Sequence, residues 1–120
     1  MWNIPDKNVL KKIPRLYETD QIEAEEKLIY LHFFVGGSDW FIAEYDGEDT
    51  FFGFVCLNGM KEFAEWGYIS FQELKELRVE QPILVNGEPE ILWLEVECDK
   101  YWKVRKAKDV PLICECQRWR

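Results

Sequence analysis

The chain has 120 residues, of which 48% are hydrophobic and 16% aromatic, and its formal net charge is −8. This composition excludes disorder over the whole length, and the negative charge disfavours general DNA binding. No apolar run approaches the roughly 20 residues of a membrane span, and the first residues lack the basic start and apolar stretch of a signal peptide. We therefore expect a cytoplasmic protein that forms a single domain over residues 1–120.

A short helix is predicted near the start of the chain. Residues 6–13 carry an apolar stripe and lie between Pro5 and Pro14, and a helix rarely continues into a proline. The acidic residues 20–27 follow. We expect a solvated loop there rather than a helical turn, because few of its residues could face a core.

Three strands joined by two short turns dominate the centre of the sequence. The runs over 28–35, 40–45 and 50–57 are rich in aromatic and β-branched residues, which suit a pleated, half-buried surface. Gly36-Gly37 and Asp46-Gly47 separate these runs, and glycine adopts positive φ without a steric cost. Both faces of the first run are apolar, which predicts a strand covered on both sides at the centre of an antiparallel sheet.

One more helix is predicted after this meander. Ser70 and Glu73 match a capping box, in which the serine side chain accepts a hydrogen bond from the backbone three residues on. The apolar spacing that follows predicts a helix through about residue 78. Residues 61–66 are ambiguous, and we interpret them as one helical turn that Gly67 closes.

Asn86-Gly87 predicts a hairpin turn between two extended arms, residues 83–85 and residues 91–98. Two further short strands are expected over residues 101–105 and 111–114. Together these elements predict an α+β fold, with a mostly antiparallel sheet built on the three-strand meander and two or three short helices.

The four cysteines, Cys56, Cys98, Cys114 and Cys116, do not indicate disulfides or a metal site. No export signal supports an oxidising compartment, and the first two lie in apolar strand patterns, where a buried free thiol is the ordinary interpretation. The last two lack the second pair and the wider spacing that are typical of zinc sites. We predict no metal and no cofactor.

Charge is unevenly distributed along the chain. Residues 100–120 carry seven basic and two acidic side chains, a net charge of +5, so that residues 1–99 have a net charge of −13. A body of that charge repels nucleic acid, whereas the basic tail could contact phosphate. The alternative, which we favour, is that the tail packs against acidic parts of the same fold.

Six short segments carry a resemblance through their order and spacing. They are Pro14–Thr19, His32–Phe34, Ser38–Asp46, Phe52–Val55, Gly67–Leu74 and, more weakly, Val96–Trp102. In these segments the chain resembles a family of small proteins of unknown function encoded on bacterial plasmids, conjugative elements and phages. It departs from the family at residues 79–94, which look like an insertion, and at Cys98, where the family usually has an arginine. The resemblance implies a mobile-element origin and action in the cytoplasm, and it supplies no catalytic residue.

Four carboxylates, Glu44, Asp46, Glu48 and Asp49, cluster at the second turn of the meander. Paired carboxylates can perform acid–base chemistry or bind a hard cation such as Mg²⁺. The alternative is a solvated acidic turn, which is the usual role of a charge run. The sole histidine, His32, lies in an apolar strand and is interpreted as a satisfied core residue rather than a catalytic base.

Six tryptophans are present, and most of them must be buried in the core. Trp2 and Trp119 lie near the termini, and Trp93 alternates with Glu95 and Glu97. Aromatic residues are enriched at the hot spots of protein interfaces. These positions are therefore candidates for a partner-binding surface.

Two functions remain. The first is a non-enzymatic mobile-element protein that binds another protein, for example an acidic inhibitor of a host defence nuclease or defence complex that mimics DNA; its predicted partner-binding residues are Glu44, Asp46, Glu48, Asp49, Trp93, Glu95, Glu97 and Trp119. An acidic surface competes with phosphates for a basic channel. The second is a metal-dependent hydrolase that uses the carboxylates of residues 44–49. We favour the first, because the chain lacks a credible pair of base and nucleophile, and we expect neither direct nucleic-acid binding nor membrane contact.

Overall fold

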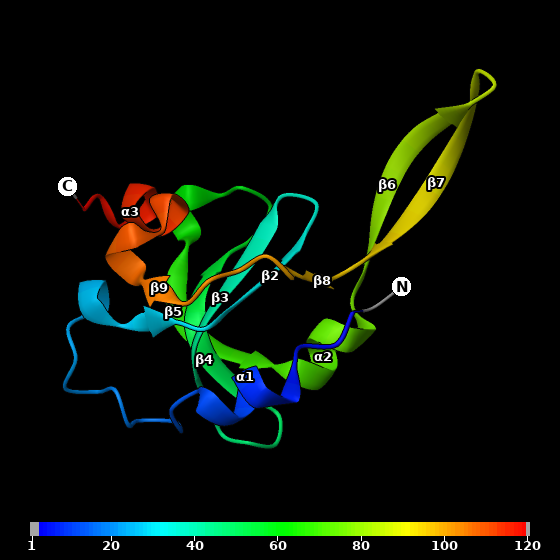
Figure 1. The fold of residues 1–120 in the computed structure, drawn as a ribbon. Coiled ribbons are helices and arrows are strands. Elements are labelled where there is room, and N and C mark those ends of the chain that lie inside the picture. Colours follow the sequence, from blue (N-terminus) through cyan, green and yellow to red (C-terminus); the bar gives the residue numbers. More distant parts are fainter. Residues whose placement is uncertain (1–2, 120) are drawn as a thin grey trace.

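A five-stranded antiparallel sheet forms the body of the protein, in a computed structural model that describes residues 3–119 (Figure 1). The strand order is β5-β4-β3-β2-β8, so the predicted meander supplies the three central strands and the α+β fold class is confirmed. The strands of this sheet are β2 (Leu31–Val35), β3 (Ser38–Tyr45), β4 (Thr50–Cys56), β5 (Glu65–Ser70) and β8 (Glu97–Cys98).

Three α-helices accompany the sheet, and side chains cap two of them. The α-helices are α1 (Lys7–Lys12), α2 (Phe71–Glu76) and α3 (Pro111–Gln117), and the short 3₁₀ turns are η1 (Ala24–Glu26), η2 (Lys61–Phe63) and η3 (Ala107–Asp109). Asp6 accepts a hydrogen bond from the Asn8 amide at the start of α1, and Ser70 accepts one from the Glu73 amide at the start of α2. Both predicted helices are therefore confirmed, although α2 ends at Glu76, two residues earlier than expected.

Apolar clusters cover both faces of the sheet, as the sequence predicts for its central strands. On one face Leu31 and Phe33 of β2 lie in a buried cluster with Phe71 of α2. On the other face Phe41 of β3 lies in a second cluster with Ile113 of α3. Successive residues of a strand point to opposite faces, so the meander contributes to both clusters and lies as a layer between α2 and α3 (Figure 1).

A β-bulge interrupts the pairing of β3 with β4. The register shifts between Ile42 and Glu44, and Gly53 of β4 lies opposite Ile42. A Cβ atom on Gly53 would lie 1.9 Å from the carbonyl oxygen of Phe41, so only glycine fits at this position.

Three local predictions are wrong. The first predicted strand divides, because β1 (Leu28–Ile29) pairs with β9 (Arg105–Lys106) in a separate small sheet. Of residues 101–105, only Arg105 lies in a strand, because the Asp99 side chain accepts a hydrogen bond from the Tyr101 amide and turns the chain. Residues 111–114 belong to α3, since proline at the first helical position has a φ suited to a helix.

Gly67 does not close a helical turn either. It lies inside β5, which pairs with β4 over six consecutive residues, from Thr50 opposite Ser70 to Val55 opposite Glu65. The predicted helical turn before it is limited to η2. The pairing energy of a whole edge strand outweighs the local preference of one glycine for a helix end.

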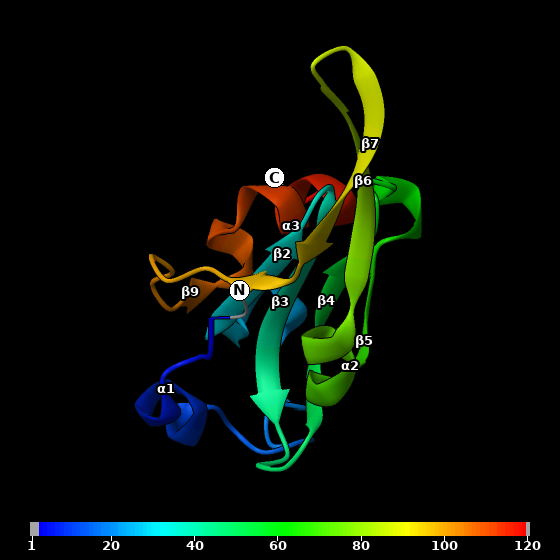
Figure 2. The same cartoon turned by 90° about the vertical axis from the view of Figure 1, so that its right-hand side faces the viewer.

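A long hairpin projects from the body of the molecule. It consists of β6 (Arg78–Val85) and β7 (Glu88–Glu95), which form a two-stranded sheet of their own and extend well past the other elements (Figures 1 and 2). The molecule measures 54 × 33 × 22 Å, and its radius of gyration is 15.4 Å, against about 13.6 Å for a compact chain of this length. We call this hairpin the arm. No helix among residues 3–119 is long and apolar enough to cross a membrane.

Candidate protein-binding arm

The arm is held together by its turn and by eight cross-strand pairs. Asn86 and Gly87 both have positive φ, 54° and 83°, which is the geometry of the two-residue turn that favours hairpins. The pairs run from Val85 opposite Glu88 to Arg78 opposite Glu95. Eight residues of extended chain give the arm a length of about 26 Å. The predicted hairpin is therefore confirmed, but its first strand is longer than the expected residues 83–85, and its second strand begins and ends three residues before the expected residues 91–98.

Both faces of the arm expose large apolar side chains. The first, which we call the Trp93 face, carries Pro82, Leu84, Pro89, Ile91 and Trp93. Leu84 is 73% exposed, Trp93 57% and Ile91 55%. The opposite face carries Ile83, Val85 and Leu92, which are also exposed. An isolated hairpin is marginally stable in water, and contiguous exposed apolar side chains are typical of binding surfaces.

The two prolines of the arm each remove one backbone hydrogen-bond donor from its free edges. Pro82 is paired with Ile91 and Pro89 with Leu84, so both belong to the same alternating class of cross-strand pair. In one of the two alternating classes the backbone N–H groups point toward the partner strand, and in the other they point away from it. Proline has no N–H and therefore fits the second class. Each free edge therefore lacks a donor, which opposes the addition of another strand along the arm.

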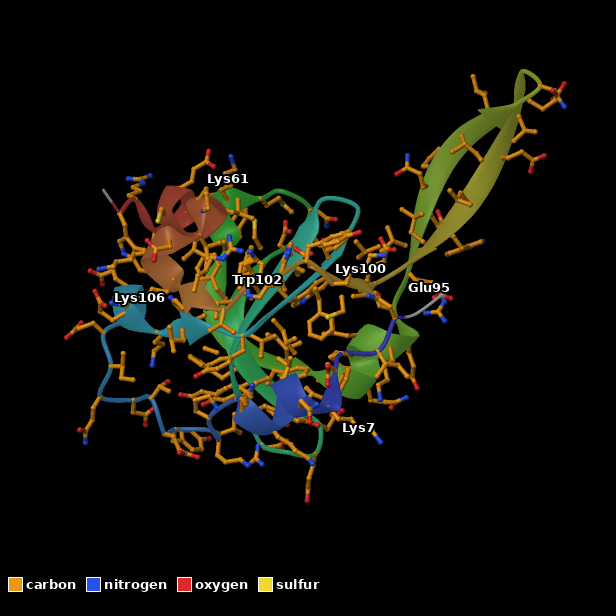
Figure 3. All side chains as sticks on the ribbon, viewed as in Figure 1. Lys7, Lys61, Glu95, Lys100, Trp102 and Lys106 are labelled. Atoms are coloured by element: carbon orange, nitrogen blue, oxygen red, sulfur yellow. The ribbon has the colours of Figure 1, made fainter. Side chains whose placement is uncertain are left out.

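The base of the arm is anchored in the body. Val79 and Leu94, which are paired with each other, pack against the first core cluster. The carboxylate of Glu95 lies 3.5 Å from the guanidinium of Arg78, and Figure 3 shows Glu95 where the arm joins the body. Val96 is fully buried and separates β7 from β8, so the predicted continuous strand 91–98 is divided between the arm and the main sheet.

Three of the residues predicted to bind a partner lie together at this base. Trp93, Glu95 and Glu97 line a hollow of about 270 Å³ with Leu94. Glutamate is also frequent along the arm, which carries four glutamates and one arginine between residues 78 and 95. The arm thus combines exposed apolar faces with negative charge.

Glu44 does not lie on an acidic surface. Its side chain is 2% exposed and accepts hydrogen bonds from the backbone amides of Tyr17, at 2.8 Å, and Thr19, at 3.1 Å, and from the Thr19 hydroxyl. The Thr19 hydroxyl oxygen in turn accepts a hydrogen bond from the buried ammonium of Lys27. The prediction that Glu44 lies on an exposed acidic turn is wrong, since its buried carboxylate anchors the loop before β1 to the sheet.

The other carboxylates of this cluster mostly stabilise the turn between β3 and β4. One oxygen of Asp46 accepts three backbone hydrogen bonds, from Glu48, Asp49 and Thr50, and these amides, that of Glu48 first, lower the pKa of Asp46. Asp49 accepts hydrogen bonds from the Ser70 hydroxyl and the Gln72 amide at the start of α2.

Of the four predicted carboxylates, Glu48 keeps an exposed side chain at the turn. The carboxylates of Glu44, Asp46 and Asp49 accept hydrogen bonds from three different segments of the chain. Within residues 3–119, no group of three acidic, histidine or cysteine side chains is placed to hold a metal ion.

The tryptophan near the C-terminus differs from the prediction of an exposed surface. Trp119 is partly buried and packs against the second core cluster beside α3. Trp2 lies outside the described residues. Part of the basic tail packs on acidic residues, as favoured from the sequence: Lys106 and Lys108 lie 2.7 and 2.8 Å from the Glu26 carboxylate and lower its pKa to about 2.

His32 holds together two segments that are distant in the sequence. Its Nε2 lies 2.7 Å from the Asp39 carboxylate and its Nδ1 3.2 Å from that of Asp99, while the ring stacks on Phe41. Asp99 also donates its backbone amide to the His32 carbonyl. The interpretation as a satisfied histidine is confirmed. The contact with Asp99 fixes the chain just after β8, the strand by which the chain returns from the arm to the main sheet.

Burial suppresses the reactivity of two of the four cysteines, Cys98 and Cys116. Cys56, Cys98, Cys114 and Cys116 are all free thiols, and the first two are buried as predicted. Burial raises the pKa of Cys98 to about 11, with a smaller contribution from Asp99. Burial and the neighbouring Cys56 raise the pKa of Cys116 to about 11 as well.

We expect Cys98 and Cys116 to react with iodoacetamide at pH 7 about two orders of magnitude more slowly than an ordinary thiol, whose pKa is about 8.5. The thiolate is the reacting species, and its fraction at neutral pH falls as the pKa rises. The rates, followed by mass spectrometry of the native protein, should increase with pH up to about 11. An ordinary thiol rate at pH 7 for either residue would contradict this account.

Comparisons of the chain with models of protein families, with curated proteins and with solved structures give no match.

Proposed function

We propose that this protein acts by binding another protein and that the arm is the element it inserts into its partner. The observation that supports this proposal most is the exposure of Leu84, Ile91 and Trp93 on an element that projects from an otherwise well-packed body. Tryptophan and large aliphatic side chains provide most of the binding energy when a partner buries them. Ordering such an arm in advance also reduces the entropy lost on association.

The prolines favour a particular mode of binding. Since Pro82 and Pro89 weaken both free edges as templates for a further strand, the arm binds through its faces. A partner would therefore offer a cleft that covers both apolar faces, rather than a sheet edge that the arm extends.

The charge of the arm indicates the chemistry of that cleft. Four glutamates surround the apolar side chains, so a cleft with an apolar floor and basic margins is complementary. The DNA-binding channel of a nuclease has basic margins, and the resemblance to a family from mobile elements makes a host defence nuclease the first partner to test. In this proposal the acidic contacts come from the arm, and Glu44 contributes none of them.

A site-specific crosslink tests the proposal. A photoreactive phenylalanine analogue at Leu84 should crosslink to one bacterial protein, and purified samples of that protein should bind the unmodified chain. Substituting Trp93→Ser should then weaken binding by about 30-fold or more, as expected for a hot-spot residue.

The matched control is Phe63→Ser, which removes an aromatic side chain that is 72% exposed but lies on η2, outside the arm. It should leave the affinity unchanged. Equal losses for Trp93→Ser and Phe63→Ser, or binding that survives the removal of both Ile91 and Trp93, would refute the arm as the binding element.

A further inference from the structure

At the opposite end of the molecule from the arm, three cationic side chains converge on one pocket. The pocket measures about 200 Å³ and is lined by Lys7, Leu10, Lys11, Arg15, Tyr45 and Gly47. Both ribbon views place α1, which carries the lysines, far from the tip of the arm, and Figure 3 marks Lys7 there (Figures 1–3). This charge lies within a chain whose net charge is −8.

The two lysines occupy one side of α1. Lys7 and Lys11 are four residues apart, so they are neighbours on the helix surface, where two like charges repel each other. Neither lysine forms an ion pair within residues 3–119, whereas Lys61, Lys106 and Lys108 each have a carboxylate partner. A bound anion would relieve the repulsion.

The turn between β3 and β4 holds the Arg15 side chain in position. Its Nη1 donates to the carbonyl oxygen of Tyr45 at 3.3 Å, and its backbone amide donates to the Glu18 carboxylate. Gly47 has a φ of 88°, and a Cβ atom there would lie 3.3 Å from the Arg15 Cζ. The guanidinium therefore lies close against the glycine backbone.

Asp46 and Glu48 flank Gly47 in sequence; the Glu48 side chain is exposed, whereas that of Asp46 is engaged within the turn. Asp46, the residue before Gly47, accepts three backbone hydrogen bonds at one oxygen, which holds its side chain within its own turn. Arg15 has no ion pair within residues 3–119 and retains donors beyond the one that Tyr45 uses.

We propose that this pocket binds a small phosphate-bearing anion, such as a diphosphate or a phosphate monoester. A guanidinium fork recognises phosphate oxygens in a bidentate manner, and two ammonium groups add charge without strict geometry. The pocket is smaller than the roughly 300–1,000 Å³ of sites for larger organic ligands, which suits a phosphate group with little attached to it.

Titration with inorganic diphosphate, followed by amide and arginine side-chain NMR signals, tests this site in the intact chain. We expect saturable shifts at Arg15, Gly47 and Lys11, and a loss of affinity of about tenfold or more in Arg15→Gln. The control, Lys103→Gln, removes the same charge from the exposed basic tail and should bind diphosphate as the unmodified chain does.

Melting temperatures of both variants establish that the fold is retained, and Lys11→Gln provides a second test if Arg15→Gln fails to fold. Three outcomes would overturn the proposal: no saturation at millimolar diphosphate, equal losses in Arg15→Gln and Lys103→Gln, or equal affinity for sulfate and diphosphate, which would indicate an adventitious ion only.

Discussion

Substituting Glu44→Ala is expected to lower the free energy of unfolding by about 3–5 kcal/mol, the usual cost of removing one partner from a buried charged network. The substitution leaves the amides of Tyr17 and Thr19 and the Thr19 hydroxyl without their acceptor, in a buried network that also includes the ammonium of Lys27 through Thr19. Urea unfolding measures the effect as a lower midpoint at an unchanged slope.

Glu48→Ala is the matched control, because the sequence places both glutamates in the same acidic cluster. The Glu48 side chain is exposed, and the residue contributes to the turn through its backbone amide and carbonyl, which alanine retains. Its effect should remain within about 0.5 kcal/mol. Similar effects of the two substitutions would mean that Glu44 lies on a solvated face after all.

Gly53→Ala is expected to destabilise the sheet by more than about 3 kcal/mol, beyond the usual cost of an overpacked core. The new Cβ would lie 1.9 Å from the Phe41 oxygen and 2.9 Å from the Phe41 carbonyl carbon. Both of these are backbone atoms, so no side-chain rotation relieves the clash. The pairing of β3 with β4 must open at the bulge, and thermal melting will report the loss.

Gly67→Ala provides a stringent control, because Gly67 is the cross-strand partner of Gly53. A Cβ atom on Gly67 would meet nothing within 4 Å. Replacing a glycine at a compatible position restricts the unfolded chain and stabilises the fold by about 0.4–1 kcal/mol. A stable Gly53→Ala protein, or an equal loss at both positions, would show that the close approach of β3 to β4 is incorrect.

Local signals account for the parts of the fold that the sequence predicts correctly. The turns at Gly36-Gly37 and Asp46-Gly47, the capping box at Ser70 and the turn at Asn86-Gly87 each depend on a few adjacent residues. The helix α3 also had such a signal, because Pro111 stands at its first position and Ile113 falls on its buried side. The apolar run over residues 111–114 favours a strand instead, which is why the sequence predicts a strand there.

Contacts between distant residues account for what sequence patterns miss. Glu44 belongs to an acidic run, and nothing local indicates that Tyr17 and Thr19 provide donors for it. The position of Asp39 beside His32 follows from the register of the meander, whereas Asp99 reaches His32 only because the arm between them leaves the body and returns. The pocket beneath α1 combines residues 7–15 with residues 45–47, which no periodicity joins.

The two strands of the arm leave the body at the same level, with Arg78 paired with Glu95. This pairing restricts how the length of the arm can change in evolution. Adding one residue to each strand would exchange the two faces and turn Leu84 to the other side. Adding two residues to each strand restores the original facing and lengthens the hairpin by about 7 Å. Natural variants should therefore differ in reach by even numbers of residues per strand, with the sheet beneath unaltered.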